Sequence, residues 1–267
     1  MNKFGIIQGR LLPNNKNLLQ KFPSKKWKKE IYLIKKFGFN YLELLYDREE
    51  SPENPIVNGK FSEIKKLKKK YKISTPNLCV EYLTKFPAEK WEDKSEEIEN
   101  KMSQIIKKSK ILGVKNLIIP VIFSKPNPRR KNIKKIFQFL KKIKLKFNTN
   151  ILLETNISTK KISRQLLKNR NIKICLDLGN LKGLNFNLHD EIKDAKNQIG
   201  LVHIKDKKKN SNKNQLLGKG DVDFKESFKT LRKIKYKGNY TLETAHGNYP
   251  ALNASKQLNI IKHIFKK

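Results

Sequence analysis

Apolar residues along the chain gather in eight short runs, and longer stretches of helical period separate these runs. The runs cover residues 4–9, 41–46, 73–80, 116–123, 150–155, 172–178, 200–206 and 239–245. Each run has the length of a strand, and most are almost continuously apolar. Such runs are typical of parallel strands that are buried on both faces. The pattern therefore predicts eight strands.

Amphipathic helices are predicted between the runs and after the last one. In 27–39, Trp27, Ile31, Ile34 and Phe37 share one face, lysines cover the other, and Gly38 is expected to end the helix. Similar stretches cover 61–71, 95–113, 133–147, 158–169, 188–199 (the weakest), 223–234 and 255–267. Alternation of strands and helices indicates a parallel sheet of the α/β class. Eight units within 267 residues favour a single-domain (β/α)8 TIM barrel over 1–267 rather than an open doubly wound sheet.

The charge of the chain changes this picture little. Lys and Arg number 61 against 24 Asp and Glu, a formal net charge of +37, and 54 of the 61 are lysines. Proteins that read nucleic acids rely on arginine for bidentate contacts, whereas these lysines cover the solvated faces of the predicted helices. We interpret the excess as codon bias from an AT-rich genome and expect no specific nucleic-acid partner. A functional polycation and a preference for anionic substrates are the alternatives.

The cysteines and the apolar runs indicate the compartment. Cys79 and Cys175 both lie inside apolar runs and are predicted to be buried thiols, so no disulfide framework is expected. The N-terminal apolar stretch is too short for a signal peptide, and Arg10 interrupts it. The run at 116–123 is far below the ~20 residues of a membrane helix. We therefore expect a cytoplasmic protein without a membrane partner.

Polar residues stand at the ends of the last four runs, and together they predict a metal site. They are Glu154, Asp177, His203 and Glu243. The functional groups of a barrel lie at the carboxyl ends of its strands, and adjacent strands are ~4.8 Å apart, so we expect these side chains to converge. Three nearly buried carboxylates repel one another unless a cation offsets their charge. A set of three oxygens and one nitrogen suits Mn²⁺, Mg²⁺ or Co²⁺, with Zn²⁺ as a further candidate.

The order of these four residues resembles that of the xylose-isomerase-like barrel superfamily of sugar phosphate isomerases and epimerases. Five further segments resemble motifs of that family, so that the likeness covers essentially the whole chain. They are Gly-Ile-Ile-Gln-Gly-Arg-Leu-Leu-Pro (5–13), Asn-Pro-Ile (54–56), Asp-Leu-Gly-Asn (177–180), His-Ile-Lys-Asp (203–206) and Leu-Gly-Lys-Gly-Asp-Val-Asp-Phe (217–224).

The resemblance implies one divalent metal ion held by Glu154, Asp177, His203 and Glu243. It also implies that Glu154 and Glu243 act as catalytic acid and base. The implied activity is that of a metal-dependent sugar or sugar phosphate isomerase or epimerase, which transfers a proton through a metal-bound enediolate between the two glutamates. The implied partner is a small sugar or sugar phosphate, and a homodimer or homotetramer is the assembly to test for.

Seven further residues are candidates for substrate contact, and several of them have a structural alternative. Gln8, Arg10 and Glu43 follow the first two runs and either contact sugar hydroxyls or form hydrogen bonds at the barrel top. Lys205 and Asp206 follow His203, and Asp206 is predicted to orient His203 or Lys205. The candidates in longer loops are Asn180 and Lys219.

These two loop residues carry separate expectations. Asn180 stands where several relatives carry a histidine, which puts a second metal in doubt. Segment 207–222 is long for a strand–helix loop and is predicted to form a lid. Within it, Lys219 is either a phosphate contact or a flexible loop lysine.

Three other functions compete with this hypothesis. A dehydratase acting on a sugar or inosose uses the same kind of metal site. An AP endonuclease of the endonuclease IV type uses a three-zinc site that consumes several histidines, and this chain has only His189, His203, His246 and His263. A basic barrel that only binds nucleic acid leaves the four converging groups without explanation.

Overall fold

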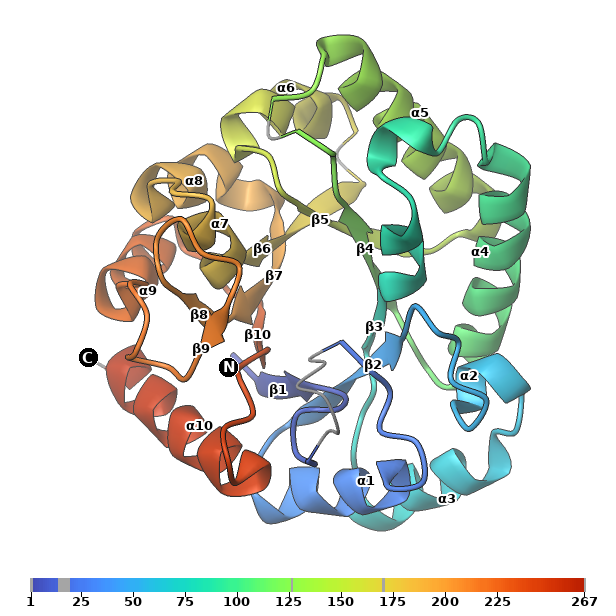
Figure 1. Ribbon diagram of the computed structural model, residues 1–267, viewed down its shortest axis with the longest axis vertical. Helices are drawn as coiled ribbons and strands as arrows, with labels where there is room; N and C mark the ends of the chain where they lie inside the picture. Colours follow the sequence, from blue (N-terminus) through green and yellow to red (C-terminus); the bar gives the residue numbers. More distant parts are fainter. Residues whose placement is uncertain (1, 14–19, 126, 170, 267) are drawn as a thin grey trace.

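Eight parallel strands form a closed barrel in the computed structural model, which describes residues 2–13, 20–125, 127–169 and 171–266 (Figure 1). Around the barrel the order is β1-β10-β7-β6-β5-β4-β3-β2. The strands are β1 (Phe4–Ile7), β2 (Tyr41–Tyr46), β3 (Asn77–Val80), β4 (Asn116–Val121), β5 (Asn150–Thr155), β6 (Ile172–Asp177), β7 (Ile199–Ile204) and β10 (Asn239–Leu242). The predicted single-domain (β/α)8 TIM barrel is confirmed.

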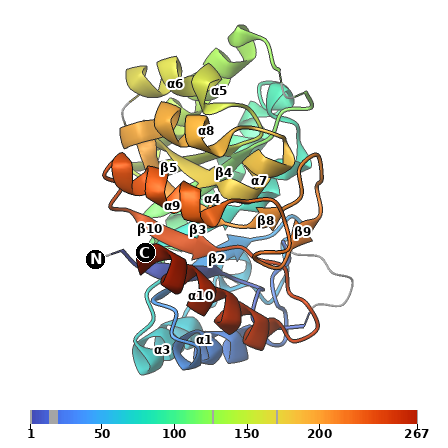
Figure 2. The ribbon, with the colours of Figure 1, turned by 90° about the vertical axis from the view of Figure 1, so that its left-hand side faces the viewer.

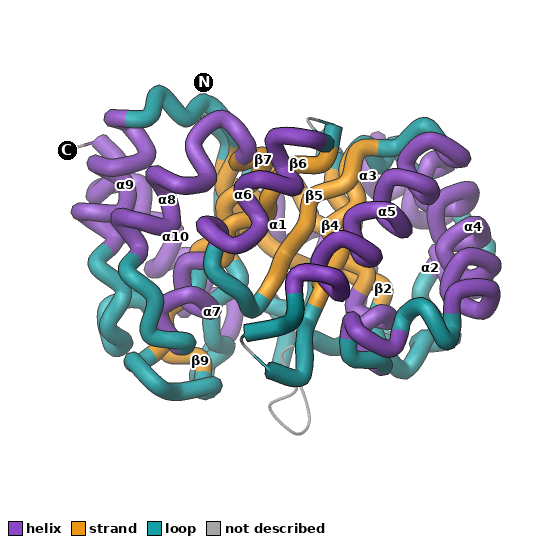
Figure 3. The backbone as a smooth tube through the Cα atoms, turned by 90° about the horizontal axis from the view of Figure 1, so that it is seen from above, coloured by secondary structure: helices purple, strands orange, loops and turns teal. Residues whose placement is uncertain are grey.

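Helices surround the barrel and cover the outer face of its strands, as the ring in Figure 1 and the view from above in Figure 3 show. The long ones are α1 (Trp27–Lys36), α3 (Ser62–Tyr71), α4 (Ser95–Ile111), α5 (Arg130–Phe147), α6 (Thr159–Lys168), α8 (Leu188–Ala195), α9 (Phe224–Lys233) and α10 (Pro250–Lys266). Each corresponds to a stretch predicted from its helical period. Among the described residues, no helix combines the length and the apolar character needed to cross a membrane.

Each helix is fixed by an apolar face and by local signals at its ends. The buried residues of α5 recur every three or four positions: Ile133, Ile136, Phe137, Leu140 and Ile143. Side chains of Ser158, Asn187 and Asp223 accept hydrogen bonds from the first backbone N–H groups of α6, α8 and α9. Gly38, with φ of +76°, follows α1 in a left-handed conformation that a residue without a side chain adopts at low cost.

The interior of the barrel contains one apolar layer, and polar side chains follow it toward the carboxyl ends of the strands. Seven strands each contribute one side chain to the apolar layer: Ile7, Leu45, Cys79, Ile118, Leu152, Cys175 and Leu201. Both cysteines are free and buried, as predicted. A larger apolar core lies between the strands and the helices and supports the barrel from outside. The interior positions next to the apolar layer are therefore available for polar side chains.

Several elements differ from the sequence prediction. Strand β3 begins at Asn77 instead of residue 73, because Pro76 has no N–H to donate to the ladder and only Ser74 forms an isolated bridge to Tyr41. Two short helices were not predicted, α2 (Pro55–Asn58) and α7 (Leu178–Gly183). The segment predicted as a lid holds an antiparallel pair, β8 (Asp206–Lys207) with β9 (Asn214–Gln215), which projects at one end of the barrel (Figure 2).

Candidate metal centre and active site

The four side chains predicted to bind a metal come together at the carboxyl end of the barrel. Glu154 lies near the end of β5, Asp177 ends β6, His203 lies on β7, and Glu243 follows β10. One ligand atom from each residue lies within 4.8 Å of the ligand atoms of the other three, and all four residues are buried. The parallel register brings the strand ends to one level, since Asp177 pairs with His203 across β6 and β7. We call this group the carboxylate cluster.

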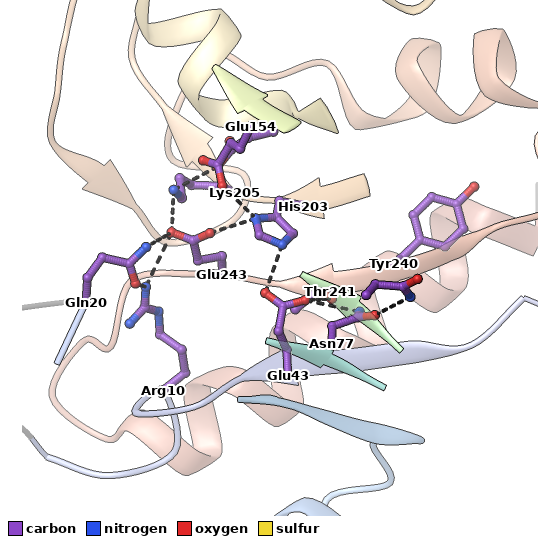
Figure 4. Close-up of polar contacts among 12 residues, drawn as sticks. Arg10, Gln20, Glu43, Asn77, Glu154, His203, Lys205, Tyr240, Thr241 and Glu243 are labelled. Carbon is purple, nitrogen blue, oxygen red and sulfur yellow. Dashed lines mark hydrogen bonds and ion pairs between the residues drawn. The ribbon is translucent and has the colours of Figure 1, made fainter. Parts of the chain in front are cut away.

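The His203 ring stands between carboxylates on both sides (Figure 4). Its Nδ1 lies 2.9 Å from Glu243 Oε2 and 3.7 Å from Glu154 Oε2, whereas its Nε2 lies 2.9 Å from Glu43 Oε1. These are charge contacts, because neither ring nitrogen forms a hydrogen bond of acceptable angle with any described residue. Burial opposes a charged ring, but the neighbouring Cys175 and Glu43 outweigh it and raise the pKa of His203 well above its usual range.

The cluster fits a divalent cation because several of its members each have one buried polar atom that forms no hydrogen bond. Among the described residues, Asp177 Oδ2, His203 Nδ1 and Glu243 Oε2 form no hydrogen bond of acceptable angle, although Lys205 Nζ lies 2.8 Å from Asp177 Oδ2 and His203 Nδ1 lies 2.9 Å from Glu243 Oε2. The other oxygens are used: Asp177 Oδ1 accepts from Asn180 N at 2.7 Å, and Glu243 Oε1 accepts from Gln20 Nε2 at 2.7 Å. Buried polar atoms are normally paired, so the remaining atoms mark where a cation can bind. Carboxylate oxygens with one imidazole nitrogen suit a borderline or hard ion.

Glu43 contacts the Nε2 side of the His203 ring, opposite the Nδ1 side that Glu154 and Glu243 approach. Its side chain is fully buried, and its Oε2 accepts hydrogen bonds from Thr241 Oγ1 at 2.9 Å and Asn77 Nδ2 at 3.3 Å (Figure 4). With Glu43 Oε1 opposite Nε2, a proton on Nε2 leaves the Nδ1 lone pair directed at the carboxylate cluster. The structure thus shows the hydrogen bonds inside the barrel that were the alternative to a sugar contact.

The two predicted catalytic glutamates have opposite electrostatic environments. Burial raises the pKa of Glu154 to about 8, and the nearby Glu243 and Asp177 add to this effect. Burial also opposes the ionisation of Glu243, but Lys205, His203 and Arg10 outweigh it and hold the pKa of this carboxyl well below its usual range. A pair of carboxyls separated in this way can serve as proton donor and proton acceptor at one pH.

Three donors surround Glu243 Oε1, and two of them, Lys205 and Arg10, help to lower the pKa of this carboxyl. Lys205 Nζ lies at 2.5 Å, Gln20 Nε2 at 2.7 Å and Arg10 Nη2 at 3.5 Å. Arg10 also donates to Gln20 Oε1 at 2.8 Å. Arg10, a predicted substrate contact, is thus buried against Glu243.

Lys205 bridges two members of the carboxylate cluster. Its Nζ lies 2.8 Å from Asp177 Oδ2, in addition to its contact with Glu243. Burial lowers the pKa of Lys205, but Asp177, Glu243 and Glu154 more than compensate and raise it above its usual range. A Cβ at Gly179 would lie 2.7 Å from Lys205 Cγ, so the glycine in the segment Asp-Leu-Gly-Asn makes room for this lysine.

Asn180 and Gln8 take different places at the barrel top. Asn180 donates through Nδ2 to Glu154 Oε1 at 2.9 Å, and its Oδ1 accepts from Lys205 Nζ at 3.4 Å. It therefore contacts the carboxylate cluster. Gln8 is buried and its Oε1 accepts from Leu45 N at 3.3 Å, which ties it to the backbone of β2.

Asp206 anchors the following loop and forms no hydrogen bond with His203 or Lys205 within the described chain, so the predicted orienting role is wrong. Its carboxylate accepts from the backbone N–H groups of Gly218 at 2.8 Å, Gly220 at 2.9 Å and Val222 at 3.2 Å. A Cβ at Gly220 would lie 2.1 Å from Asp206 Oδ1, so only glycine allows this approach. Lys219 sits on this anchored loop with its side chain exposed.

Sequence reasoning missed two residues of the site. Gln20 contacts Glu243 from the segment between β1 and α1, which carries no pattern that predicts such a contact. Glu81 follows β3 directly and is nearly buried; burial, with Glu243 as the next cause, raises its pKa to about 7. A polar residue after an apolar run was the signal used for the last four strands, and it would have identified Glu81 as well.

Two of the remaining histidines, His246 and His189, have partners outside the carboxylate cluster. His246 Nε2 lies 2.6 Å from Gly9 O, and His189 Nδ1 lies 2.9 Å from Thr230 Oγ1. In the described ranges, the only groups of three or more potential metal ligands both contain Glu154 and His203. This arrangement gives no support to a histidine-rich site for three zinc ions.

Comparison with known proteins agrees with the barrel fold. A family model described as xylose isomerase-like TIM barrel matches residues 31–264. A putative L-ribulose-5-phosphate 3-epimerase of Shigella dysenteriae serotype 1 is 23% identical over 252 residues, which cover 88% of this chain and 89% of the relative. The L-ribulose-5-phosphate 3-epimerase of Escherichia coli strain SMS-3-5 matches to the same extent.

Solved structures share the fold at low sequence identity. The 3-keto-D-glucoside 4-epimerase YcjR of E. coli has a TM-score of 0.71 at 20% identity, covering 98% of this chain and 100% of that one. The D-psicose 3-epimerase of Clostridium cellulolyticum H10 has a TM-score of 0.69 at 15% identity, with 98% and 99% covered. The IOLI protein, solved with a zinc atom, has a TM-score of 0.71 at 18% identity, with 98% and 96% covered.

Proposed function

The chain belongs to the xylose isomerase-like TIM barrel family, and on this premise we propose that it is a divalent-metal-dependent isomerase or epimerase of a sugar or sugar phosphate. The observation that carries the proposal is the pairing of Glu154 and Glu243. Both approach His203 Nδ1 in one buried cluster that also contains Asp177, and Lys205 Nζ lies 2.5 Å from Glu243 Oε1. The sugar epimerases among the relatives support the same reaction class.

The proposed reaction moves a proton between carbon and these carboxyls. Glu243, kept ionised by Lys205 and its neighbours, accepts the proton from the carbon next to the substrate carbonyl. Glu154, which lies on the same side of His203 as Glu243, is the proposed donor that returns a proton to the resulting enediolate. Return to the opposite face of the same carbon gives an epimer, and return to the adjacent carbon gives an aldose–ketose isomer.

The proposed role of the metal is electrostatic. A bound divalent ion supplies positive charge that polarises the substrate carbonyl and lowers the cost of removing the neighbouring proton. Glu154, Asp177, His203 and Glu243 are the residues that would hold it. Glu43 would hold the His203 ring in the orientation that presents Nδ1 to the cluster.

Other residues have proposed roles in binding and assembly. Asn180 and Lys205 donate to members of the cluster and are proposed to contact sugar hydroxyls. Lys219, exposed on the loop that Asp206 anchors, is the proposed contact for a substrate phosphate. We propose a cytoplasmic enzyme and leave a homodimer or homotetramer as the assembly to be measured.

Metal content tests the proposal first. Wild type, His203→Ala and His263→Ala are purified and analysed for divalent ions, with thermal unfolding as a check of folding. His263 is exposed on α10 and serves as the matched control. We expect about one divalent ion per chain in wild type and His263→Ala and almost none in His203→Ala. No uptake by wild type when Mn²⁺, Mg²⁺, Co²⁺ or Zn²⁺ is added would refute the metal-dependent function.

A substrate screen then defines the reaction. The metal-loaded protein is incubated with ketopentoses, ketohexoses and their phosphates, and products are separated by chromatography. A new epimer or aldose identifies both the substrate and the carbon that changes. Faster turnover of a phosphate than of the free sugar, lost selectively in Lys219→Ala, would support the phosphate contact.

A further inference from the structure

A second group of potential metal ligands overlaps the carboxylate cluster and includes a thiol. Glu154, Cys175 and His203 each offer one ligand atom, these atoms all lie within 4.8 Å of one another, and the three residues are buried. The group shares Glu154 and His203 with the carboxylate cluster. It replaces the carboxylates of Asp177 and Glu243 by one sulfur. We call it the thiol position.

Strand register explains why the thiol lies there. Cys175 and Asp177 are two residues apart on β6, so both face the barrel interior at a spacing of ~6–7 Å along the strand. The register pairs Leu153 with Ile174, and the next residues along, Glu154 and Cys175, are therefore neighbours across β5 and β6. The Cys175 thiol also belongs to the apolar layer of the barrel interior, which lies below the site. An ion at this position would sit deeper in the barrel than one held by Asp177 and Glu243.

His203 indicates a ligand here independently of the thiol. Its side chain is 0% exposed, its Nε2 faces Glu43 Oε1 at 2.9 Å, and its Nδ1 forms no hydrogen bond of acceptable angle with any described residue. Fully buried imidazole nitrogens without partners are rare, because each costs the desolvation of a polar group. The ring can therefore offer a nitrogen to an ion next to Cys175 or to one next to the carboxylates, but not to both at once.

The two groups differ in the ions they suit. Three carboxylates with one imidazole suit Mn²⁺, Mg²⁺ and Co²⁺ and can also hold Zn²⁺, whereas thiolate with carboxylate and imidazole favours softer ions and resembles three-ligand zinc sites. We propose that Zn²⁺ and Cd²⁺ bind at the thiol position, through Cys175 Sγ, Glu154 and His203. On binding, a metal–sulfur bond forms, the S–H proton passes to solvent, and no oxidation state changes.

Competition between ions follows from the shared residues. Glu154 and His203 belong to both groups, so an ion at the thiol position removes them from the carboxylate cluster. Soft ions would then exclude Mn²⁺ and inhibit the enzyme. The inference rests on the proposed function only through the assignment of Glu154 and His203 as metal ligands.

Cadmium absorption distinguishes the two positions. The full chain is stripped of metal and titrated with Cd²⁺ while the sulfur-to-metal charge-transfer band is followed in the ultraviolet. The chain has two cysteines, both buried, so only two sources of this band exist. Cys79 shares the apolar layer with Cys175 but belongs to neither ligand group, which makes Cys79→Ser the matched control for Cys175→Ser.

We expect the band in wild type and Cys79→Ser and its loss in Cys175→Ser, with Mn²⁺ binding, read by electron paramagnetic resonance, kept in all three. Cys175→Ala is a second variant if serine destabilises the fold. A band that persists in the Cys175 variants overturns the inference. Cd²⁺ bound by wild type without the band also overturns it, and retained Mn²⁺ binding would then leave the proposed function intact. If neither ion binds wild type, both proposals fail.

Discussion

The pH dependence of stability should change when Glu30 is replaced by glutamine. Glu30 is fully buried on α1, and its carboxylate accepts from Gly9 N at 2.8 and 3.0 Å and from Leu11 N at 3.2 Å. These bonds hold the start of the segment between β1 and α1 that brings Arg10 and Gln20 to Glu243. Burial raises the pKa of Glu30 from 4.5 to about 7, even though the hydrogen bonds and Arg10 oppose the shift.

The sign and size of the effect follow from proton linkage. Between pH 4.5 and 7 the unfolded chain has lost the Glu30 proton and the folded chain keeps it, so the free energy of unfolding falls as pH rises. Each pH unit is worth about 1.4 kcal/mol, and the pKa is raised by roughly 2.5, so the loss is on the order of 3 kcal/mol. Stability from this group is complete below pH 4.5 and lost above pH 7.

Urea unfolding of wild type and Glu30→Gln at intervals from pH 4.5 to 8 measures this effect. Glutamine keeps an acceptor oxygen and does not titrate. We expect the unfolding free energy of wild type minus that of Glu30→Gln to fall by on the order of 3 kcal/mol over the range. Glu63→Gln, which removes an exposed carboxylate of α3, controls for the change in net charge. A difference that stays constant or rises with pH would refute the reasoning.

Three further predictions concern the site itself. Glu154→Gln and Glu243→Gln should each lower kcat by about 10²–10⁴ on the substrate that the screen identifies, and near-normal kcat in either variant would remove that glutamate from the proton transfer. Glu43→Ala should weaken Mn²⁺ binding by about 10- to 100-fold in calorimetry, because His203 loses the group that orients it. Glu43→Gln should recover part of the lost affinity. Equal Mn²⁺ affinity in wild type and both variants would contradict this role of Glu43. Asp206→Ala leaves three backbone N–H groups without their acceptor and should destabilise the fold by about 3 kcal/mol. Amide hydrogen exchange over residues 214–222 should become faster. Unchanged exchange in this segment would argue against the role of Asp206 as its anchor.

The barrel itself was predictable because its strands are buried on both faces. Runs such as 150–155 and 41–46 match β5 and β2 to the residue, since an uninterrupted apolar run marks a central strand. The start of β3 was misplaced by four residues because the apolar pattern continues through Pro76, which cannot join the ladder. The pair of β8 and β9 lies in a polar loop and depends on the Asp206 anchor, which periodicity does not report.

The residues of the candidate site were predictable where the end of a strand fixes the position of the side chain. They were not predictable where the register of other strands or the path of a loop fixes it. Glu154, Asp177, His203 and Glu243 could be placed together because parallel strands end at one edge. The position of Glu43 behind His203 depends on the register between β1, β2 and β10, which the sequence does not specify. Gln20 reaches Glu243 only through the path of a long loop.

Solvent deuterium exchange tests the central claim most directly. Metal-loaded wild type is incubated in D₂O with a panel of ketoses and ketose phosphates, and deuterium at the carbon next to the carbonyl is followed by nuclear magnetic resonance. We expect exchange at that carbon, together with formation of an epimer or isomer, and loss of both in Glu243→Gln and after chelation of the metal. Absence of exchange with every substrate, from protein shown to hold its divalent ion, would contradict the proposed isomerase or epimerase.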